Sequence, residues 1–392
     1  MSKSLSEVSK GFDIVVVGAG VFGAWTAHEL VKAGKRVLLV DAHGPGNSRA
    51  SSGGESRIIR MGYGADEVYT RWSARSLERW KSLFSAGYQN PPLFHQTGVL
   101  WMAREDDSYA EASVRTVQRL GIEFEKLSRA ELDRRFPQVA LGQTAWGFLE
   151  PGSGVLLARR AVAAVVAETV RAGGEFCLDA ILPPDARASH VQDVRTRSGS
   201  SIQADVFVFA CGPWLPKLFP DLLARRISPT RQEVFFIGVP SGEQRFSPPK
   251  LPTWIDFPEE VYGMPDIESR GLKVAFDRHG PPFDPDTGDR IVSRESIQAV
   301  KAFVARRFPA LKGAPVVETR VCQYENTSNG DFLVDRHPDY QNVWLVGGGS
   351  GHGFKHGPAM GEYAAAQILG QGTAEPRFSL KTKGTVQKRT VY

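Results

Sequence analysis

A glycine-rich turn between a strand-like run and a helical pattern constrains this chain more than any other feature. The apolar run 15–17 ends at Gly18, and Gly20 and Gly23 follow as the helical pattern begins. Gly18 permits a tight turn, Gly20 lets the backbone approach a pyrophosphate, and Gly23 lets helix and strand pack closely. Asp41 closes the next strand-like run, where its carboxylate can accept hydrogen bonds from ribose hydroxyls. With the amides at the helix start, these residues predict a dinucleotide site.

Length and composition predict two domains, with no membrane span and no metal site. The chain has 392 residues, of which 42% are apolar, and this is enough for a large core. It contains no run of 18 apolar residues, and residues 1–10 are polar, unlike a secretory signal. Cys177, Cys211 and Cys322 are too scattered for a disulfide framework or a metal centre. They suit a reducing compartment, so we expect a cytoplasmic protein.

The net charge of +5 does not predict a nucleic-acid partner, because the 48 basic residues are mixed with 43 acidic ones. The charge fits an enzyme that attracts small anions. The stretch 377–392 is basic and contains no acid, and we expect it to be solvated or loosely packed. Residues 1–10 and 386–392 are expected to be flexible ends.

Two kinds of sequence pattern alternate along the chain. Helical and strand patterns follow one another at 157–172 and 204–210, and they return at 342–369, where residues 347–353 form a second glycine-rich turn. Between 220 and 315 the sequence becomes rich in proline and aromatic residues, with the short alternating runs typical of antiparallel strands. The alternation predicts an α/β (α+β) fold in which one domain interrupts the other.

We expect a discontinuous Rossmann-like cofactor domain made of residues 11–95, 150–220 and 320–385. The intervening residues, 96–149 and 221–319, are expected to form a substrate domain with a mainly antiparallel sheet. Simple nicotinamide dehydrogenases more often keep the nucleotide-binding half contiguous, so this interleaving argues against them.

Five stretches make the chain recognisable, namely 51–60, 262–265, 271–274, 321–324 and 350–355. Together they resemble the monomeric sarcosine oxidase family, which includes N-methyltryptophan oxidase and pipecolate oxidase. The resemblance extends over nearly the whole chain. It implies a monomeric FAD enzyme that oxidises a secondary amino acid by hydride transfer from the amine to flavin N5. It also implies that oxygen accepts the electrons, giving an imine and hydrogen peroxide.

The resemblance also implies roles for residues around the cofactor. Cys322 matches the cysteine that carries the flavin through a thioether, whereas a lone cysteine is more often a buried apolar thiol. Arg57 is implied to lie beside the flavin. His352 is implied to contact the cofactor or line the pocket, although an isolated histidine is more often structural. The other residues expected to bind the cofactor are Gly18, Gly20, Gly23, Asp41, Ser52, Gly349, Gly351, Gly353 and Lys355.

Arg60 and Lys355 match the positions that hold the substrate carboxylate in the family. A guanidinium supplies a planar two-pronged donor and an ammonium adds a point charge, so the pair can orient an anion. The alternative is that both are surface charges, as most arginines and lysines are. Tyr262 and Tyr324 are expected to line the same substrate site.

Lys273 interrupts the apolar run 272–276, where strand alternation would point it away from the side occupied by Leu272 and Val274. The resemblance implies that this lysine contacts the flavin through water and activates oxygen, because its charge would stabilise developing superoxide. The alternative is a lysine that faces solvent from an edge strand.

Departures from the family pattern leave the substrate open. Gly53 replaces a histidine, Phe276 and Asp277 replace an aromatic–histidine pair, and Gly349 stands where relatives often carry a bulkier aromatic residue. A larger or cyclic secondary amino acid, pipecolate-like, proline-like or N-methylated aromatic, is therefore at least as well supported as sarcosine. Two other functions stay open: a flavin dehydrogenase with a non-oxygen acceptor, and a non-catalytic or RNA-associated flavoprotein.

Overall fold

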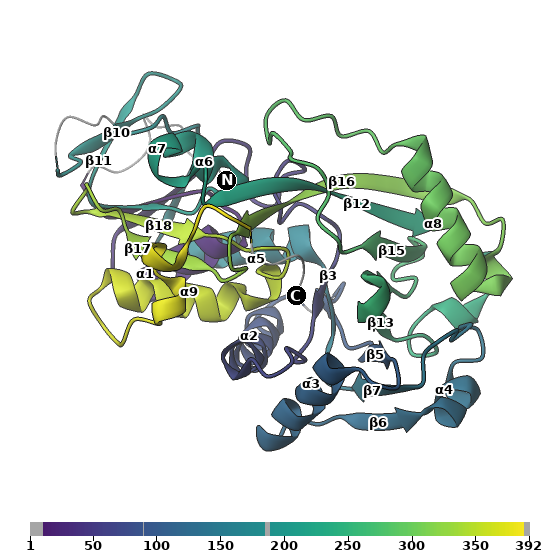
Figure 1. Ribbon diagram of the computed structural model, residues 1–392. Helices are drawn as coiled ribbons and strands as arrows, with labels where there is room; N and C mark the ends of the chain where they lie inside the picture. The colour runs from purple at the N-terminus through teal and green to yellow at the C-terminus, as the bar shows by residue number, and fades with distance from the viewer. Residues whose placement is uncertain (1–10, 89, 185–188, 388–392) are drawn as a thin grey trace.

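The computed structural model describes residues 11–88, 90–184 and 189–387 (Figure 1). Within these residues the backbone forms a seven-stranded sheet, an eight-stranded sheet and a three-stranded sheet. Figure 1 shows the helices α1, α5 and α9 beside the first sheet and the second sheet on the other side of the molecule. This arrangement confirms the predicted mixed α/β fold, with a parallel and a mainly antiparallel sheet.

The seven-stranded sheet is assembled from three separated parts of the chain. Its strands are β1 (Phe12–Val17), β2 (Val37–Asp41), β9 (Glu175–Leu178), β10 (Asp193–Arg195), β11 (Ser201–Phe209), β17 (Leu333–Arg336) and β18 (Val343–Gly347). They run in the order β17-β18-β11-β1-β2-β9, and β10 pairs with β11. The pairings from β18 to β9 are parallel, whereas β17 is antiparallel to β18. β1 reads as a continuous apolar run because both of its faces are covered.

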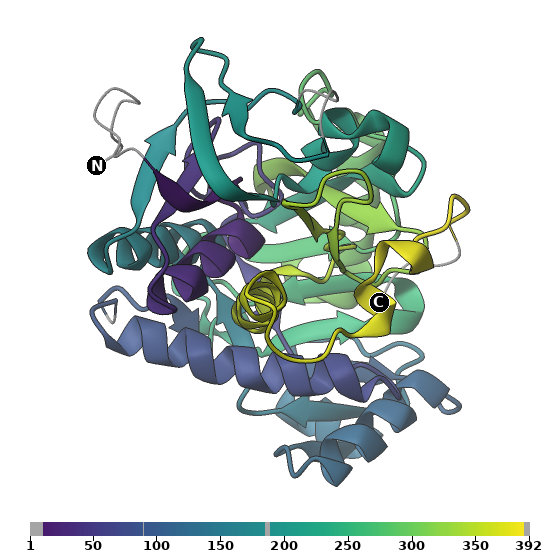
Figure 2. The same cartoon turned by 90° about the vertical axis from the view of Figure 1, so that its left-hand side faces the viewer.

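Helices cover both faces of this sheet. On one face lie α1 (Val21–Lys32), α5 (Ala158–Arg171) and α9 (Gly357–Ile368), and α1 contacts the other two. The long helix α2 (Glu67–Ser85) packs outside them against α9 and is seen along its length in Figure 2. The other face packs against the short helices α6 (Leu215–Leu218) and α7 (Pro220–Leu223), which share a core cluster with β1.

The eight-stranded sheet is antiparallel apart from one pair. Its strands are β5 (Val99–Ala103), β6 (Glu125–Ser128), β7 (Trp146–Glu150), β12 (Ile227–Ile237), β13 (Thr253–Asp256), β14 (Val261–Met264), β15 (Leu272–Phe276) and β16 (Val316–Thr327). Their order is β16-β12-β15-β14-β13-β5-β7-β6, and β13 and β5 are the parallel neighbours. The predicted domain boundary at residue 320 falls within β16. The boundaries themselves remain a prediction.

Smaller elements surround this sheet. The three-stranded sheet consists of β3 (Arg57–Ile59), β8 (Gly154–Leu156) and β4 (Phe94–His95), in that order. The helices of this half are α3 (Ser108–Arg119), α4 (Arg129–Arg135) and α8 (Arg294–Arg307). The paired strands β12 and β16 extend from this half towards the seven-stranded sheet, as Figure 1 shows.

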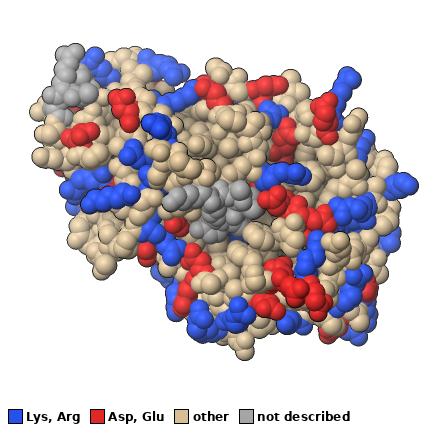
Figure 3. All heavy atoms as spheres, viewed as in Figure 1, with Lys and Arg blue, Asp and Glu red and all other residues tan. Residues whose placement is uncertain are grey.

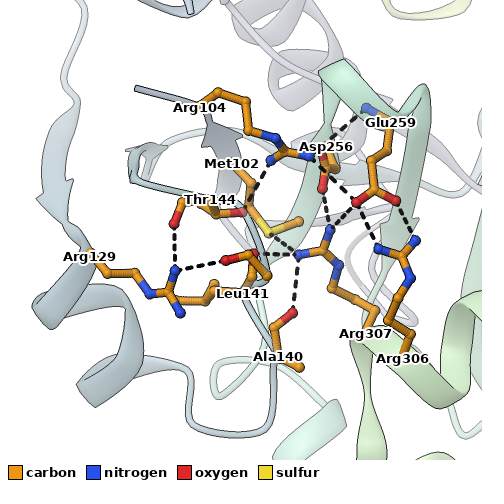
Figure 4. Close-up of polar contacts among 11 residues, drawn as sticks. Met102, Arg104, Arg129, Ala140, Leu141, Thr144, Asp256, Glu259, Arg306 and Arg307 are labelled. Carbon is orange, nitrogen blue, oxygen red and sulfur yellow. Dashed lines mark hydrogen bonds and ion pairs between the residues drawn. The ribbon is translucent and has the colours of Figure 1, made fainter. Parts of the chain in front are cut away.

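An ion cluster joins the end of α8 to β5 and β13 (Figure 4). Asp256 and Arg307 are buried at its centre, and Arg104, Glu259 and the exposed Arg306 surround them. Arg307 is 1% exposed; it pairs with Asp256 and lies 3.0 Å from Glu259. Arg104 Nη2 lies 3.1 Å from Asp256 Oδ1, and Arg306 pairs with Glu259. Every charge in the cluster therefore has an opposite charge beside it, which offsets the cost of burial.

Within the described residues, none of the helices has the length and apolar character needed to cross a membrane. On the face shown in Figure 3, basic and acidic side chains are interspersed and do not form a single-sign surface.

The basic C-terminal stretch is packed more tightly than its composition indicated. Lys383 is 2% exposed, and its Nζ donates to the carbonyl oxygen of Arg377 at 2.6 Å and to Asn329 Oδ1 at 3.3 Å. Arg377 pairs with Asp66 at 2.6 Å. The expectation of a solvated or loosely packed tail is thus wrong for this part. Of the predicted flexible ends, residues 1–10 and 388–392 lie outside the described residues, and 386 and 387 are exposed.

Candidate active site

A cavity of about 370 Å³, called here the cofactor cavity, lies at the carboxyl ends of the parallel strands. This is the edge at which doubly wound sheets bind ligands. Of the residues predicted to bind the cofactor, those that line it are Gly18, Gly20, Asp41, Ser52, Arg57, Cys322, Gly349, Gly351 and Gly353. Gly23 and Lys355 do not line this cavity.

The first glycine turn owes its shape to close backbone contacts. Gly18 has φ +105°, and a Cβ there would lie 2.4 Å from the carbonyl oxygen of Ala210. A Cβ on Gly23 would lie 1.9 Å from the carbonyl oxygen of Gly18. Gly23 thus brings α1 against the turn, so that the first amides of the helix face the cavity side of the sheet.

Asp41 and Ser52 tie neighbouring segments to this turn. The amide of Ala19 donates to Asp41 Oδ2 at 2.7 Å, and the amide of Val21 donates to Ser52 Oγ at 3.0 Å. Burial raises the pKa of the Asp41 carboxyl, although backbone amides oppose the shift. Both side chains therefore shape the loop as well as lining the cavity.

The second glycine turn rests on Glu325, a buried acid in β16 that the sequence analysis missed. The amide of Gly349 donates to Glu325 Oε1 at 3.0 Å, while Oε2 has no hydrogen-bond partner among the described residues. Burial raises the pKa of Glu325 to about 7. Because Glu325 lines the cofactor cavity, a protonated carboxyl can serve there as a donor. Its position three residues after Cys322 was the available signal.

A second cavity of about 80 Å³, called here the substrate cavity, adjoins the first. The two share Arg57, Tyr324, Gly351 and Phe354 as wall residues. The other polar residues around the substrate cavity are Arg60, Tyr262, Asp277, His279, Ser350, His352 and Lys355. The structure therefore brings together the four residues predicted to bind substrate and places them next to the cofactor cavity.

Lys355 and Arg60 are both buried, with 5% and 6% of their surface exposed. Lys355 lies in the short 3-10 helix η6 (Phe354–His356), and its Nζ donates to the Tyr63 hydroxyl at 2.7 Å and to the carbonyl oxygen of His352 at 2.9 Å. Arg60 directly follows β3, and its guanidinium carbon lies 4.3 Å from the centroid of the Tyr63 ring. The alternative of two surface charges is wrong.

Tyr63 is the centre of a buried hydrogen-bond network that the sequence analysis did not find. Its hydroxyl lies 2.7 Å from His356 Nε2 and 3.2 Å from His352 Nδ1. His352 Nε2 lies 3.0 Å from the carbonyl oxygen of Gly330, so this nitrogen carries the proton. Burial, followed by the nearby Lys355, lowers the pKa of His356 well below its ordinary value. The network thus places Lys355 and the neutral imidazole of His356 on the same Tyr63 hydroxyl.

Arg57 connects Cys322 to the serine-rich loop. Its Nη2 lies 3.2 Å from Cys322 Sγ and donates to the carbonyl oxygen of Ser51 at 2.7 Å. Cys322 faces a guanidinium, and it lines the cofactor cavity, so the alternative of an apolar buried thiol does not describe its surroundings.

Lys273 is 2% exposed and lies in β15, an interior strand between β12 and β14. The alternative of a solvent-facing lysine on an edge strand is therefore wrong. Its Nζ donates to the carbonyl oxygen of Ser56 at 2.8 Å. Burial, and then the charge of Arg57, lower the pKa of Lys273 well below its ordinary value. A third cavity, of about 250 Å³, is lined by Lys273, Arg57 and Cys322.

Tyr262 and Tyr324 form a half-buried phenolic wall of the substrate cavity. The Tyr324 hydroxyl donates to Asp277 Oδ1 at 2.7 Å. Burial and the Asp277 carboxylate raise the pKa of both phenols, so both stay neutral. Tyr324 also borders the cofactor cavity, which makes it part of the partition between the two spaces.

A family model described as "FAD dependent oxidoreductase" matches residues 13–367. The chain belongs to this family of FAD-dependent oxidoreductases. Its cavity fits FAD in three respects: the glycine turn beside the start of α1, the acid that closes β2, and the Glu325 carboxyl atom that is buried without a partner.

Named relatives place this FAD-dependent oxidoreductase among the sarcosine-oxidase-like amine oxidases. It is 33% identical to the peroxisomal sarcosine oxidase of Homo sapiens over 90% of each chain. It is 31% identical to the monomeric sarcosine oxidase of Bacillus sp. strain B-0618, over 98% of this chain and 100% of the other. The N-methyl-L-tryptophan oxidase of Salmonella heidelberg is 28% identical over 94% and 97%.

Solved structures support the fold alone. The L-proline dehydrogenase of P. horikoshii aligns with a TM-score of 0.83 at 21% identity, covering 95% of this chain and 98% of the other. The glycine oxidase of Geobacillus kaustophilus aligns with a TM-score of 0.79 at 20% identity, covering 95% and 99%. Both match the arrangement of a parallel and an antiparallel sheet described above.

Proposed function

We propose that this FAD-dependent oxidoreductase oxidises a secondary amino acid, N-alkylated or cyclic, and passes the electrons to oxygen. The observation that carries the proposal is the contact between two cavities: the one that holds Arg60 and Lys355 adjoins the cofactor cavity along Tyr324 and Gly351. The names of the relatives, sarcosine oxidase and N-methyl-L-tryptophan oxidase, support the substrate class.

Arg60 and Lys355 bind the substrate carboxylate in this proposal. Both are buried, so an anion between them interacts through little water, and the Tyr63 network keeps the Lys355 ammonium in place. Tyr262 and Tyr324 exclude water and set the depth of the cavity. FAD, when bound, supplies the acceptor for a hydride from the carbon next to the amine. His352 supports the site through Tyr63 and need not remove a proton.

Lys273 is the proposed oxygen-activating residue. It lines a cavity that shares Arg57 and Cys322 with the cofactor cavity, so oxygen can approach from a side other than the substrate's. Because burial lowers the pKa of Lys273, a developing anion nearby restores its affinity for a proton. A fixed donor in a water-poor site stabilises such charge far better than bulk water does.

Cys322 is the proposed covalent anchor of FAD. Support comes from its place on the cavity wall and from its contact with Arg57, which also lines the cofactor cavity. Precipitating the purified yellow protein with acid tests the bond, because a covalently held flavin stays with the polypeptide. Colour left in the supernatant contradicts the proposed link.

One experiment tests the proposed activity. The purified yellow protein is mixed anaerobically with N-methyl amino acids, proline and pipecolate, and the flavin absorbance is followed. Bleaching by one of these compounds, followed by peroxide formation when oxygen is admitted, is the expected result. Bleaching without peroxide supports the dehydrogenase with another acceptor, and no bleaching contradicts the proposed substrate class.

Two further properties belong to the proposal. We expect a monomer, as in the relatives named monomeric sarcosine oxidase, and size-exclusion chromatography with light scattering measures it. We also expect a cytoplasmic location without a nucleic-acid partner, in keeping with three scattered cysteines and interspersed charges. Cell fractionation and a salt-dependent RNA retention assay test these two points.

A further inference from the structure

Asp277 stands out among the residues that surround the substrate cavity. It directly follows β15 and is the one carboxylate that lines this cavity within the described residues. Three cations, Arg57, Arg60 and Lys355, line the same space. In a cavity that binds only a carboxylate, an acid on the wall would weaken that binding, because like charges repel.

The position of the Asp277 carboxylate is well defined. Its Oδ1 accepts a hydrogen bond from the Tyr324 hydroxyl at 2.7 Å, and its amide donates to the carbonyl oxygen of Glu260 at 2.7 Å. An ionised carboxylate offers about four lone-pair sites, so it can accept further hydrogen bonds while Tyr324 holds it. Tyr324 also borders the cofactor cavity, so the acid lies behind the partition where the two cavities meet.

An amino acid in water carries both a carboxylate and an ammonium group. Arg60 and Lys355 complement the first group, whereas their charges disfavour the second. The ammonium must also lose a proton before a hydride can leave the neighbouring carbon, because the nitrogen lone pair stabilises the positive charge that develops. A carboxylate on the cavity wall can both attract the ammonium group and accept its proton.

We propose that Asp277 binds the substrate's ammonium group and accepts its proton, while Arg60 and Lys355 hold the carboxylate. In this step one N–H bond breaks, one O–H bond forms on Asp277, and the electron pair stays on the amine nitrogen. The substrate class is thus a dipolar α-amino acid, and carboxylic acids without a basic nitrogen are disfavoured. This inference rests on the proposed oxidation of a secondary amino acid.

The replacement Asp277→Asn removes the charge and keeps an oxygen that can accept from Tyr324. Anaerobic rapid mixing with an amino acid that bleaches the wild-type protein measures the rate of flavin reduction. At neutral pH we expect the variant to be slower by about 10²-fold or more, the range of a general base. The deficit should shrink as the pH rises, because the free amine then arrives already deprotonated.

Other ionisable groups surround the same cavity and titrate in both proteins, so only the difference between the two pH profiles reports on Asp277. These groups are Arg57, Arg60, Tyr262, His279, Tyr324, His352 and Lys355. The matched control is Asp289→Asn, which removes the same charge from an exposed position of the same loop, outside the cavities. We expect this control to reduce its flavin at the wild-type rate.

A second measurement does not depend on turnover. Cyclopentanecarboxylate has the carboxylate of proline and no amine, and its binding perturbs the absorbance of an adjacent flavin. We expect it to bind Asp277→Asn about tenfold more tightly than wild type, because a repelling charge is gone.

The outcomes separate the inference from the function on which it rests. If no amino acid bleaches the wild-type flavin, the proposed function fails. If wild type is bleached and Asp277→Asn shows the same rate and pH profile, the inference is overturned while the function stands. Slow reduction at every pH together with weaker binding of cyclopentanecarboxylate indicates a structural role and also overturns it.

Discussion

Two groups of buried cations in this protein differ in what surrounds them. In the ion cluster at the end of α8, Arg307 lies among Asp256 and Glu259, and every charge has an opposite neighbour (Figure 4). Beside the cofactor cavity, Arg57 and Lys273 donate instead to carbonyl oxygens, a serine hydroxyl and a thiol, and neither lies within ion-pair distance of a described carboxylate. Arg307 and Lys273 are both buried, but only Arg307 has carboxylates beside it.

The contrast shows how burial can serve stability in one place and chemistry in another. Burial raises the pKa of Asp256 and lowers that of Arg307, so even the paired cluster carries a desolvation cost that mutual attraction must offset. Arg57 and Lys273 bear a desolvation cost without a carboxylate of the described residues beside them. A transient negative charge, from substrate or oxygen, is the partner that such a site favours.

The largest effect is expected when the ion cluster at the end of α8 is disrupted. Replacing Arg307 by methionine leaves Asp256 buried with Arg104 as its remaining basic neighbour. We expect a loss of about 3–5 kcal/mol in the free energy of unfolding, measured by chemical denaturation, with an unchanged rate of flavin reduction. The control Arg129→Met alters a 45% exposed arginine and should cost less than about 1 kcal/mol. Equal losses in the two variants contradict the role given to the cluster.

Replacing Lys355 by methionine tests a buried cation of the substrate cavity. We expect kcat/KM for the amino acid to fall about 10³-fold, since a buried charge-assisted contact with the carboxylate is lost. Thermal stability should fall less than in the Arg307 variant, because the hydrogen bonds of Lys355 to the Tyr63 hydroxyl and the His352 carbonyl oxygen go to neutral oxygens. Steady-state kinetics and thermal unfolding measure the two quantities. A fall in kcat/KM below tenfold removes Lys355 from the clamp.

Replacing Lys273 by methionine separates the two half-reactions. Flavin reoxidation by oxygen should slow by about 10²- to 10³-fold, whereas anaerobic reduction should change only a few-fold. Stopped-flow absorbance measures both steps, and Lys301→Met on the exposed side of α8 is the control. Equal slowing of reduction and reoxidation ends the assignment of Lys273 to oxygen.

Glu325→Gln extends the comparison from buried cations to a buried acid. The pKa of Glu325 rises from 4.5 to about 7 on folding, so between these values the folded protein binds more protons than the unfolded chain. Stability therefore falls as the pH rises through this window, by up to about 3 kcal/mol, and Glu325→Gln should remove that fall. Denaturation at pH 5 and 8 measures it, with exposed Glu111→Gln as control. An unchanged slope in Glu325→Gln contradicts the raised pKa.

Local sequence was enough to predict the parts of the fold that depend on neighbouring residues. The first glycine turn, the helices near 157–172 and 358–369 and the strand near 342–346 were all found, because glycine spacing and apolar periodicity are local signals. The surroundings of Lys273 could not be read in the same way. Alternation gave the face of β15 on which it lies, but burial depends on β12 and β14, which lie far away in the sequence.

The same limit explains the residues that were missed at the site. Tyr63 and His356 are separated by 293 residues and meet only after β3 and α9 have packed, so neither residue has a local signature. The position of Asp277 was noticed as a departure, but its hydrogen bond to Tyr324 joins the end of β15 to β16, and β12 lies between these two strands. Lys383 was interpreted as part of a basic tail, because no nearby residue in the sequence indicates that Asn329 accepts its hydrogen bond.

The packing of residues 377–384 has a consequence for how the protein is made. Lys383 and the amide of Gly384 fasten the turn at Ser328 and Asn329, and the carbonyl oxygen of Gly330 in that turn receives the hydrogen bond from His352. This brace is therefore synthesised after all the residues that line the two cavities. A transcript with a stop codon after residue 376 would encode every recognisable motif and still yield a polypeptide that lacks this brace.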